Sequence, residues 1–497
     1  MNELLESLRR FHPEITLTAG LLLVVLLDAS GIKARDALCR ILSAATLVLA
    51  LLLCVPLYEA GWSGELFGGM LALDPMAVFF KVILIAASLL IALAFGSSRE
   101  LLGLGQGEFH SLLLAVTVSN LLLASANDLA MLYLALEMVS ITSYVMVAYI
   151  KGDRLSNEAS LKYVLFGAVS TGTMLYGLSL LYGMTGTTSL QGIREALATG
   201  FPEQNRFAVY LVTFLVFAGF GFKTAAVPFH FWCPDVYQGA PTPVTAFLSV
   251  APKAAGFAIM LRFFLRGMST AGPGAWELDA TVNWPVLLML ISAVTMTVGN
   301  VAALTQTNMK RLLAYSSIAH AGYIMMGVVA LSENGARSMM IYLAAYLFMT
   351  LGAFLVVTLV HYQDGTFDLR DYAGLWRRAP GLTLAMAIFL FSLMGIPPLV
   401  GFMGKLYVFA AIVEKGQAYY WYAVVAAVNA AVAAYYYARV LRTMIIDPEL
   451  EPKPLLRLSF ADASWVSFFV LANVLPLLWW SHIDGWARAS LTLFAGR

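Results

Sequence analysis

Long apolar runs separated by short polar connections are the feature that most constrains this chain. Fourteen runs are each long enough to cross a bilayer as a helix. They lie at roughly 13–28, 37–57, 73–95, 109–126, 128–150, 161–184, 207–232, 240–265, 284–303, 311–331, 338–362, 382–413, 419–446 and 462–483. Hydrophobic residues make up 60% of the chain and charged residues 12%. We therefore predict an all-α polytopic membrane protein with about fourteen transmembrane helices.

Composition and motifs argue against several classes of function. The net charge of +1 gives no reason to expect a nucleic-acid partner. The three cysteines, Cys39, Cys54 and Cys233, are unclustered, so the sequence supports no disulfide framework, iron–sulfur cluster or zinc site. There is no Walker A motif, and no GxGxxG lies between a strand and a helix. We expect neither a metal nor an organic cofactor in this chain.

The connections between the runs predict the orientation of the chain. The N-terminal segment is too polar for a signal peptide, so the first apolar run is predicted to remain as a helix. An even number of spans puts both termini on one side. Lys and Arg number about fifteen in the odd-numbered connections and about ten on the other side, so we predict that both termini face outward. With no long polar linker, residues 1–497 are predicted to form a single membrane domain.

Two of the predicted spans combine a lysine with a helix-breaking segment. The run at 207–232 carries Lys223 and Pro228, and the run at 382–413 carries Pro397, Pro398 and Lys405. Because they are the seventh and the twelfth spans, an odd number of five positions apart, the two broken helices cross the membrane in opposite directions. Such matching breaks are typical of inverted-repeat transporters. The alternative is that Pro and Gly are simply common in membrane helices.

The breaks suggest how the domain is divided. Spans 1–3 occupy about 13–95, and the first repeat, spans 4–8, occupies about 109–265. The second repeat, spans 9–13, occupies about 284–446, and span 14 occupies about 462–483.

Charged side chains inside the spans are the candidate functional residues, because a charge at that depth is costly unless it faces protein or water. Lys253 lies about 15 Å along its span and Glu137 about 13 Å along its own. We expect Glu137 to pair with Lys223, either as an exchanging pair or as a static one that only orients helices. Lys405 precedes eight apolar residues, too many for snorkelling to explain comfortably.

Further polar residues have two readings each. His320 is near mid-span and is either a proton relay or a core histidine satisfied by Ser316 or Ser317. Lys162 follows Glu158 by one helical turn, so a surface ion pair explains it about as well as a proton role. Lys81 is expected to be an interfacial or packing residue. We expect aromatic clusters to form interfacial belts without chemistry.

Three segments resemble a known family. They are GFKTAAVPFHFWCPDVYQGAPTPVTAFLSVAPKAAGFA, NMKRLLAYSSIAHAGYIMMG and GIPPLVGFMGKLYVF. Together they resemble the antiporter-like membrane subunits of respiratory complex I, NADH:quinone oxidoreductase, and most closely those of type N. Lysine rather than glutamate at 405 and an end after span 14 favour type N over the sister types M and L.

The resemblance implies roles for single residues. Glu137 and Lys223 would form the coupling ion pair, Lys253 the central proton carrier, and Lys405 the group that passes protons outward. Lys162 matches a family lysine near Glu137, and His320 aligns with the polar relay between the halves. These residues would make the chain a proton-translocating subunit without a redox centre.

The resemblance also implies which cofactors, partner subunits and membrane accompany the chain. NADH, FMN, iron–sulfur clusters and quinone are expected in partner subunits, and the partners are sister antiporter-like and small membrane subunits in a bacterial inner membrane. Two alternatives stay open. The chain could belong to a cation/proton antiporter or hydrogenase-type complex, or it could be a structural scaffold.

Overall fold

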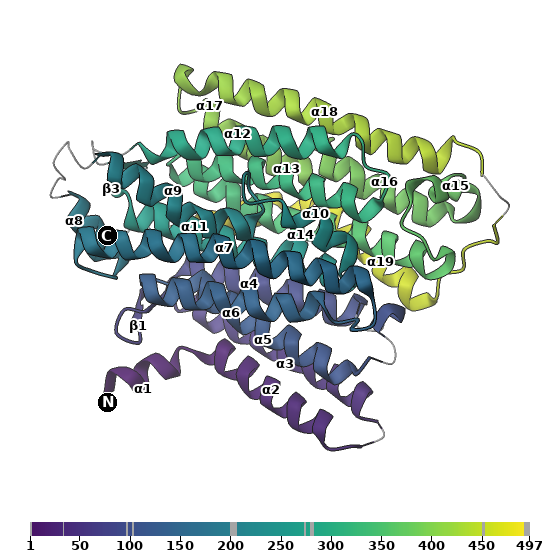
Figure 1. The fold of residues 1–497 in the computed structure, drawn as a ribbon, viewed down its shortest axis with the longest axis horizontal. Helices are drawn as coiled ribbons and strands as arrows, with labels where there is room; N and C mark the ends of the chain where they lie inside the picture. The colour runs from purple at the N-terminus through teal and green to yellow at the C-terminus, as the bar shows by residue number, and fades with distance from the viewer. Residues whose placement is uncertain are drawn as a thin grey trace.

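A computed structural model of the chain describes residues 2–32, 34–95, 98–101, 104–198, 206–272, 275–278, 283–449 and 453–491 (Figure 1). The helices are α1 (Asn2–Arg9), α2 (His12–Ala29), α3 (Arg35–Glu59), α4 (Pro75–Leu90), α5 (Gln106–Ser125), α6 (Leu129–Val147), α7 (Arg154–Thr185), α8 (Leu190–Ala198), α9 (Arg206–Thr224), α10 (Trp232–Gly239), α11 (Thr242–Arg262), α12 (Trp284–Ala303), α13 (Met309–Val329), α14 (Glu333–Asp364), α15 (Leu375–Arg378), α16 (Pro380–Met394), α17 (Val400–Val413), α18 (Tyr420–Ile445), α19 (Phe460–Val474) and α20 (Trp480–Ala489). The strands are β1 (Gly64–Leu66), β2 (Leu71–Leu73), β3 (Thr270–Gly272) and β4 (Ala275–Glu277).

The helices confirm the predicted membrane fold. Within the described residues, 13 helices are long and apolar enough to cross a membrane. The shorter apolar helices α16 and α17 follow one another and together replace the run predicted at 382–413. Counting this pair as one further crossing, 13 plus 1, gives the fourteen that the sequence predicts.

Two small antiparallel hairpins were not predicted. β1 pairs with β2 between α3 and α4, and β3 pairs with β4 between α11 and α12. Strands of three residues are too short to show an alternating pattern in the sequence. They lie in the connections, so the crossing segments remain helical.

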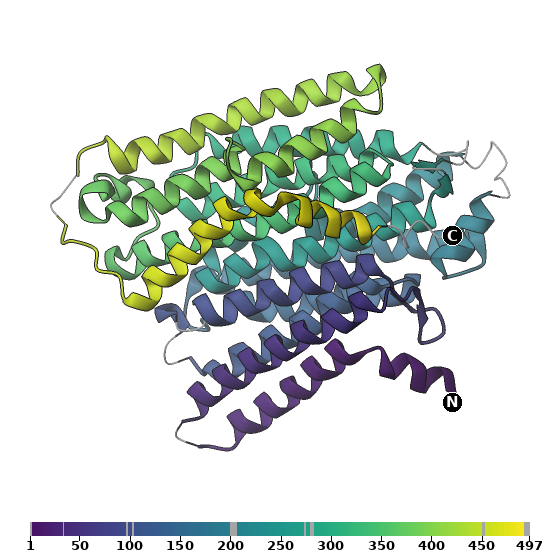
Figure 2. The same cartoon turned by 180° about the vertical axis from the view of Figure 1, so that it is seen from behind.

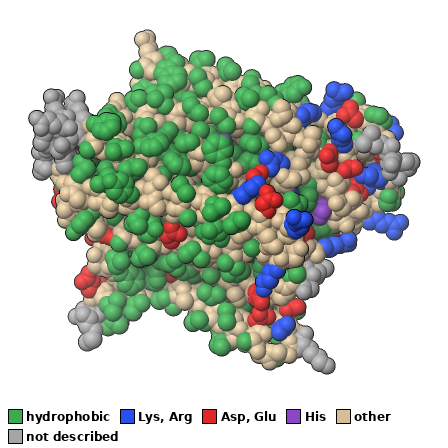
Figure 3. All heavy atoms as spheres, in the orientation of Figure 1, with side chains coloured by type: hydrophobic (Ala, Val, Ile, Leu, Met, Phe, Trp, Pro, Cys, Tyr) green, Lys and Arg blue, Asp and Glu red, His purple; other side chains and the backbone are tan. Residues whose placement is uncertain are grey.

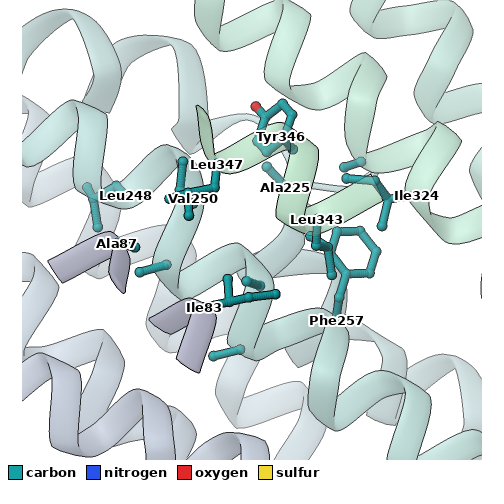
Figure 4. Close-up of a cluster of buried hydrophobic side chains, with 14 of the residues drawn as sticks. Ile83, Ala87, Ala225, Leu248, Val250, Phe257, Ile324, Leu343, Tyr346 and Leu347 are labelled. Atoms are coloured by element: carbon teal, nitrogen blue, oxygen red, sulfur yellow. The ribbon is translucent and has the colours of Figure 1, made fainter. Parts of the chain in front are cut away.

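The most central helices are α11, α13 and α14. The apolar window of α11 is 100% buried, that of α13 is 94% buried and that of α14 is 89% buried, against 28% for α2. Figure 4 shows side chains from α4, α11, α13 and α14 packed together, among them Ile83, Phe257, Ile324 and Leu343. Polar groups on these three helices are therefore shielded from lipid by the rest of the protein.

Both predicted breaks are present. α9 ends at Thr224 and α10 begins at Trp232, while α16 ends at Met394 and α17 begins at Val400. Each break frees backbone groups that need other partners. At the first break, the Trp232 indole N–H donates to the Phe222 carbonyl at 3.1 Å.

The first helix, α1, and the end of the last described helix, α20, lie at the same end of the helix bundle (Figures 1 and 2). The ring of Trp486 on α20 contacts Tyr58, at the end of α3, and Phe79, at the start of α4. On the face seen in Figure 3, Lys and Arg side chains gather toward the opposite end. On this face, basic side chains are therefore concentrated at the end of the bundle opposite to α1.

Candidate functional site

Lys253 is held in the centre of the protein by α13. Its side chain is buried, and its ammonium donates to both the hydroxyl and the carbonyl oxygen of Ser317. The Tyr237 hydroxyl on α10 lies 3.4 Å from the Ser317 hydroxyl, and the Tyr237 ring lies 5.9 Å from the Lys253 amine. Each of these partners is neutral, so they stabilise the charge by hydrogen bonding without an opposite charge.

Lys223 lies at the end of α9, directly before the first break. Its amine is buried and has no hydrogen-bond partner among the described residues. Gly256 on α11 makes room for it, because a Cβ added there would lie 3.0 Å from the Lys223 Cβ. Since Gly256 follows Lys253 by one helical turn, the two lysines lie near the same contact between α9 and α11.

Glu137 does not form the direct contact predicted for it. It lies on α6 with a partly exposed side chain, and no salt bridge within 4.0 Å joins it to Lys223 in the described parts of the chain. The carboxylate is still close enough to act on the Lys223 ammonium electrostatically. The separation follows from packing, because α6 is a peripheral helix whose apolar window is only 44% buried.

His320 lies among tyrosines on the central helix α13. Its Nδ1 is 2.9 Å from the Tyr342 hydroxyl, and its Nε2 is 3.3 Å from the Tyr437 hydroxyl. The partners predicted from the sequence, Ser316 and Ser317, are wrong. Ser316 hydrogen-bonds Tyr437, and Ser317 holds the lysine of α11. Both serines lie one turn before the histidine on the same face of α13, but their hydroxyl groups are taken by partners on other helices, and Ser316 meets His320 only through the shared Tyr437 hydroxyl.

Lys405 spans the second break. From the buried face of α17, its amine donates to the carbonyl oxygens of Leu393 at 3.0 Å and Met394 at 2.8 Å. These carbonyls end α16, where a cation is favoured by the helix dipole. Gly395 has φ +87, and a Cβ there would lie 2.7 Å from the Lys405 Cδ, so only glycine fits this turn without a shift.

Hydroxyl and amide groups connect the histidine to the second break. Tyr436 packs against Tyr437 with ring centroids 4.4 Å apart, and its hydroxyl donates to the side-chain oxygen Oδ1 of Asn300 at 3.2 Å. The Asn300 amide nitrogen lies 3.3 Å from the Tyr323 hydroxyl. The Tyr323 ring in turn lies 5.0 Å from the amine of Lys405. The result is a series of buried polar groups between the central histidine and the second break.

Residues 126–430 match the family described as "NADH:quinone oxidoreductase/Mrp antiporter, TM". This range contains every residue of the series except Tyr436 and Tyr437 on α18. The chain is also 45% identical, over 100% of its length and 99% of the relative's, to NADH-quinone oxidoreductase subunit N of Anaeromyxobacter sp. (strain Fw109-5). The chain belongs to the family of N subunits. It is an antiporter-like, proton-translocating membrane subunit of NADH-quinone oxidoreductase.

Solved structures agree with this assignment. A chain of respiratory complex I from Thermus thermophilus is 31% identical, with a TM-score of 0.78 over 95% of this chain and 98% of that one. A chain of the Mrp complex from Dietzia sp. DQ12-45-1b has a TM-score of 0.83 over 98% of this chain and 97% of that one. Its identity is 20%, which shows a shared fold and nothing further.

Lys162 lies in a polar cluster at the surface. Its amine is 2.8 Å from Glu158, as the spacing predicts, and 2.7 Å from Asp235 on α10. Asp235 is also 2.6 Å from Arg311 on α13. A cavity of about 180 Å³ opens between these side chains. Lys162 is therefore bound to the half-helix that follows the first break, and not directly to Glu137.

Lys81 is neither interfacial nor a simple packing residue. Its amine lies 2.7 Å from the carboxylate of Glu14 on α2, and the two side chains are 1% and 0% exposed. The sequence reasoning missed Glu14 because it stands near the polar N-terminal segment. The signal was a carboxylate at the start of the apolar run predicted at 13–28. Its partner could be found only from the packing of α2, α3 and α4.

The tyrosines were missed for a different reason. Tyr436 and Tyr437 belong to the triplet Tyr435–Tyr437 in α18, and the exposed member, Tyr435, faces outward as a belt residue would. The other two are fully buried with bonded hydroxyls. A buried phenol needs a polar partner, so tyrosines deep in an apolar span were the available signal.

Proposed function

We propose that this subunit carries protons along Glu137, Lys223, Lys253, His320 and Lys405. The observation that supports this most strongly is that the buried lysines of α11 and α17 are bonded to neutral hydroxyl and carbonyl groups. A buried ammonium with neutral partners is costly, and that cost disappears when the proton leaves. Hydroxyl groups beside it can both accept and donate the proton.

The two broken crossings would give the protein two related halves. We assign the first half to about 109–265, with Glu137, Lys223 and Lys253, and the second to about 284–446, with His320 and Lys405. The tyrosine and asparagine groups around His320 lie on α12, α13, α14 and α18, all within the second half. Lys162 would act at the surface cluster beside α10, where its pairing with Asp235 responds to movement of that half-helix.

The surroundings follow from the family. We place the subunit in a bacterial inner membrane with both termini outside, supported by the Lys and Arg side chains at the opposite end (Figure 3). Its partners would be sister antiporter-like subunits and small membrane subunits. NADH, FMN, iron–sulfur clusters and quinone would be bound by other subunits, whose redox reaction drives the proton movement.

Replacing Glu137 by glutamine in the assembled complex tests the coupling. The change keeps the volume of the side chain but removes the charge that acts on Lys223. Protons moved per electron pair, measured in sealed vesicles, should fall, while the exposed control Glu59→Gln should have no effect. Normal pumping and turnover in Glu137→Gln would reject this role. Pumping that requires sodium would favour a cation/proton antiporter instead.

A further inference from the structure

A second group of titratable side chains lies around the first turn of α11, at the end of the bundle away from the termini. The Glu100 carboxylate accepts from the backbone N–H of Thr242 at 2.5 Å and from its hydroxyl at 2.7 Å. The His361 Nε2, near the end of α14, lies 3.7 Å from the same carboxylate. These contacts connect the segment at Glu100 and the end of α14 to the helix that carries Lys253.

Lys310 is the third member of the group. It lies in the first turn of α13, and its amine donates to the Ala240 carbonyl at 2.6 Å, directly before α11. The ring of Phe367 stacks on the His361 ring with centroids 3.9 Å apart. The Lys310 amine lies 4.6 Å from the centroid of the same Phe367 ring. Phe367 is held there because its carbonyl accepts from the Met309 N–H at 2.8 Å.

Burial increases through the group. The side chain of His361 is 24% exposed and that of Glu100 is 13% exposed. Lys310 is 2% exposed as a residue. The order from solvent to interior is therefore a histidine, a carboxylate and a lysine, three groups able to take up and release a proton.

Polar groups also lie between this group and the centre, on both the backbone and the side chain of Tyr237. The Ala240 carbonyl that binds Lys310 also lies 3.4 Å from the Thr245 hydroxyl, which donates to the Tyr237 carbonyl at 3.0 Å. The Tyr237 hydroxyl lies 3.4 Å from Ser317, the partner of Lys253. Along α11, Thr242 and Lys253 are about 16 Å apart.

We propose that His361, Glu100 and Lys310 form a proton-uptake port that loads Lys253 from the side of the membrane opposite the termini. This rests on the proposed function of Lys253 as a proton carrier. A proton from water binds the imidazole, passes to the carboxylate, and then passes to the Lys310 amine after that amine has released its own proton inward. Each group returns to its starting protonation state.

Other charged and titratable groups also face the port. Arg99 donates to the Tyr362 carbonyl at 3.2 Å, and the Tyr362 phenol interacts electrostatically with Glu100. Asp153, at the start of α7, acts electrostatically on Lys310. A purely structural role as a cap at the N-terminus of α11 would explain the position of Glu100, because a carboxylate is stabilised at a helix N-terminus. It would not explain a histidine on its solvent side and a buried lysine on its inner side.

The test uses His361→Ala in the assembled complex in sealed vesicles. Protons moved per electron pair should fall to the value found for Lys253→Met. Millimolar imidazole in the medium on the uptake side should restore the parent value for His361→Ala, because a diffusible base replaces the missing ring, and should leave Lys253→Met unchanged. His482→Ala, an exposed histidine on α20, is the control and should pump normally.

Glu100→Gln gives a second measurement, with an expected fall that imidazole does not restore. Normal pumping in both His361→Ala and Glu100→Gln, with Lys253→Met impaired, would overturn the port and leave the proposed function intact. Normal pumping in all three variants would overturn the proposed function as well. A fall in His361→Ala that imidazole does not restore would assign a structural role to the histidine and also overturn the port.

Discussion

Replacing Lys81 by methionine should cost this subunit about 3–5 kcal/mol of folding free energy, as expected when one partner of a buried ion pair is removed. The Lys81 amine lies 2.7 Å from Glu14, and neither side chain is more than 1% exposed. At an effective dielectric constant of 20, unit charges at this distance attract by about 6 kcal/mol. Apart from the ion pair with Lys81, neither Glu14 oxygen has a polar partner among the described residues, so the variant buries an uncompensated carboxylate.

The double variant Glu14→Leu/Lys81→Met should behave differently. Removing both charges also removes both desolvation costs, so its stability should equal that of the parent or exceed it by up to about 4 kcal/mol. Equilibrium unfolding of the detergent-solubilised subunit, analysed as a double-mutant cycle, measures the coupling. The exposed pair Glu6 and Arg10, at 2.8 Å, is the control and should give at most about 1 kcal/mol. A coupling free energy of at most about 1 kcal/mol between Glu14 and Lys81 would refute a strongly coupled buried ion pair.

Three further outcomes are expected. Gly395→Ala should reduce proton pumping in the assembled complex, because the added Cβ displaces the Lys405 side chain. The control Gly186→Ala, at φ +72 with open space around it, has only the cost of the backbone conformation and should pump normally. Tyr437→Phe removes one of the two hydroxyl groups on the central histidine and should slow pumping in vesicles without unfolding the subunit. The Thr366 hydroxyl lowers the pKa of Asp371 in a connection outside the spans, so this carboxylate stabilises the fold above its unfolded pKa of about 3.9. Asp371→Asn should therefore lower the melting temperature at neutral pH, and the difference should shrink as the pH falls below about 4.

Much of the fold could be predicted because the bilayer imposes simple rules on the sequence. Apolar length predicted the crossings, and the break at Pro397 and Pro398 was readable because each proline removes a backbone donor and disfavours a helix interior. The depth of Lys253 and Lys405 followed from counting residues along their spans. The structure buries both lysines, as that depth requires.

Partners between helices could not be predicted in the same way. Which hydroxyl meets His320 depends on the rotation of α13 against α14 and α18, and no local pattern sets that angle. The pairing of Glu14 with Lys81 joins helices that neighbour each other only after folding. Glu137 was assigned a direct partner by charge alone, but the peripheral position of α6 keeps the two groups apart.

The proton-to-electron ratio of the assembled complex with Lys405→Arg tests the central claim most directly. Arginine keeps the positive charge at the end of α16, but its guanidinium has a pKa above about 12 and does not readily release a proton. If buried lysines carry protons, both Lys405→Arg and Lys405→Met should assemble and show a reduced ratio in sealed vesicles. A Lys405→Arg complex with the parent ratio would contradict the account, because charge alone would then be sufficient at this position.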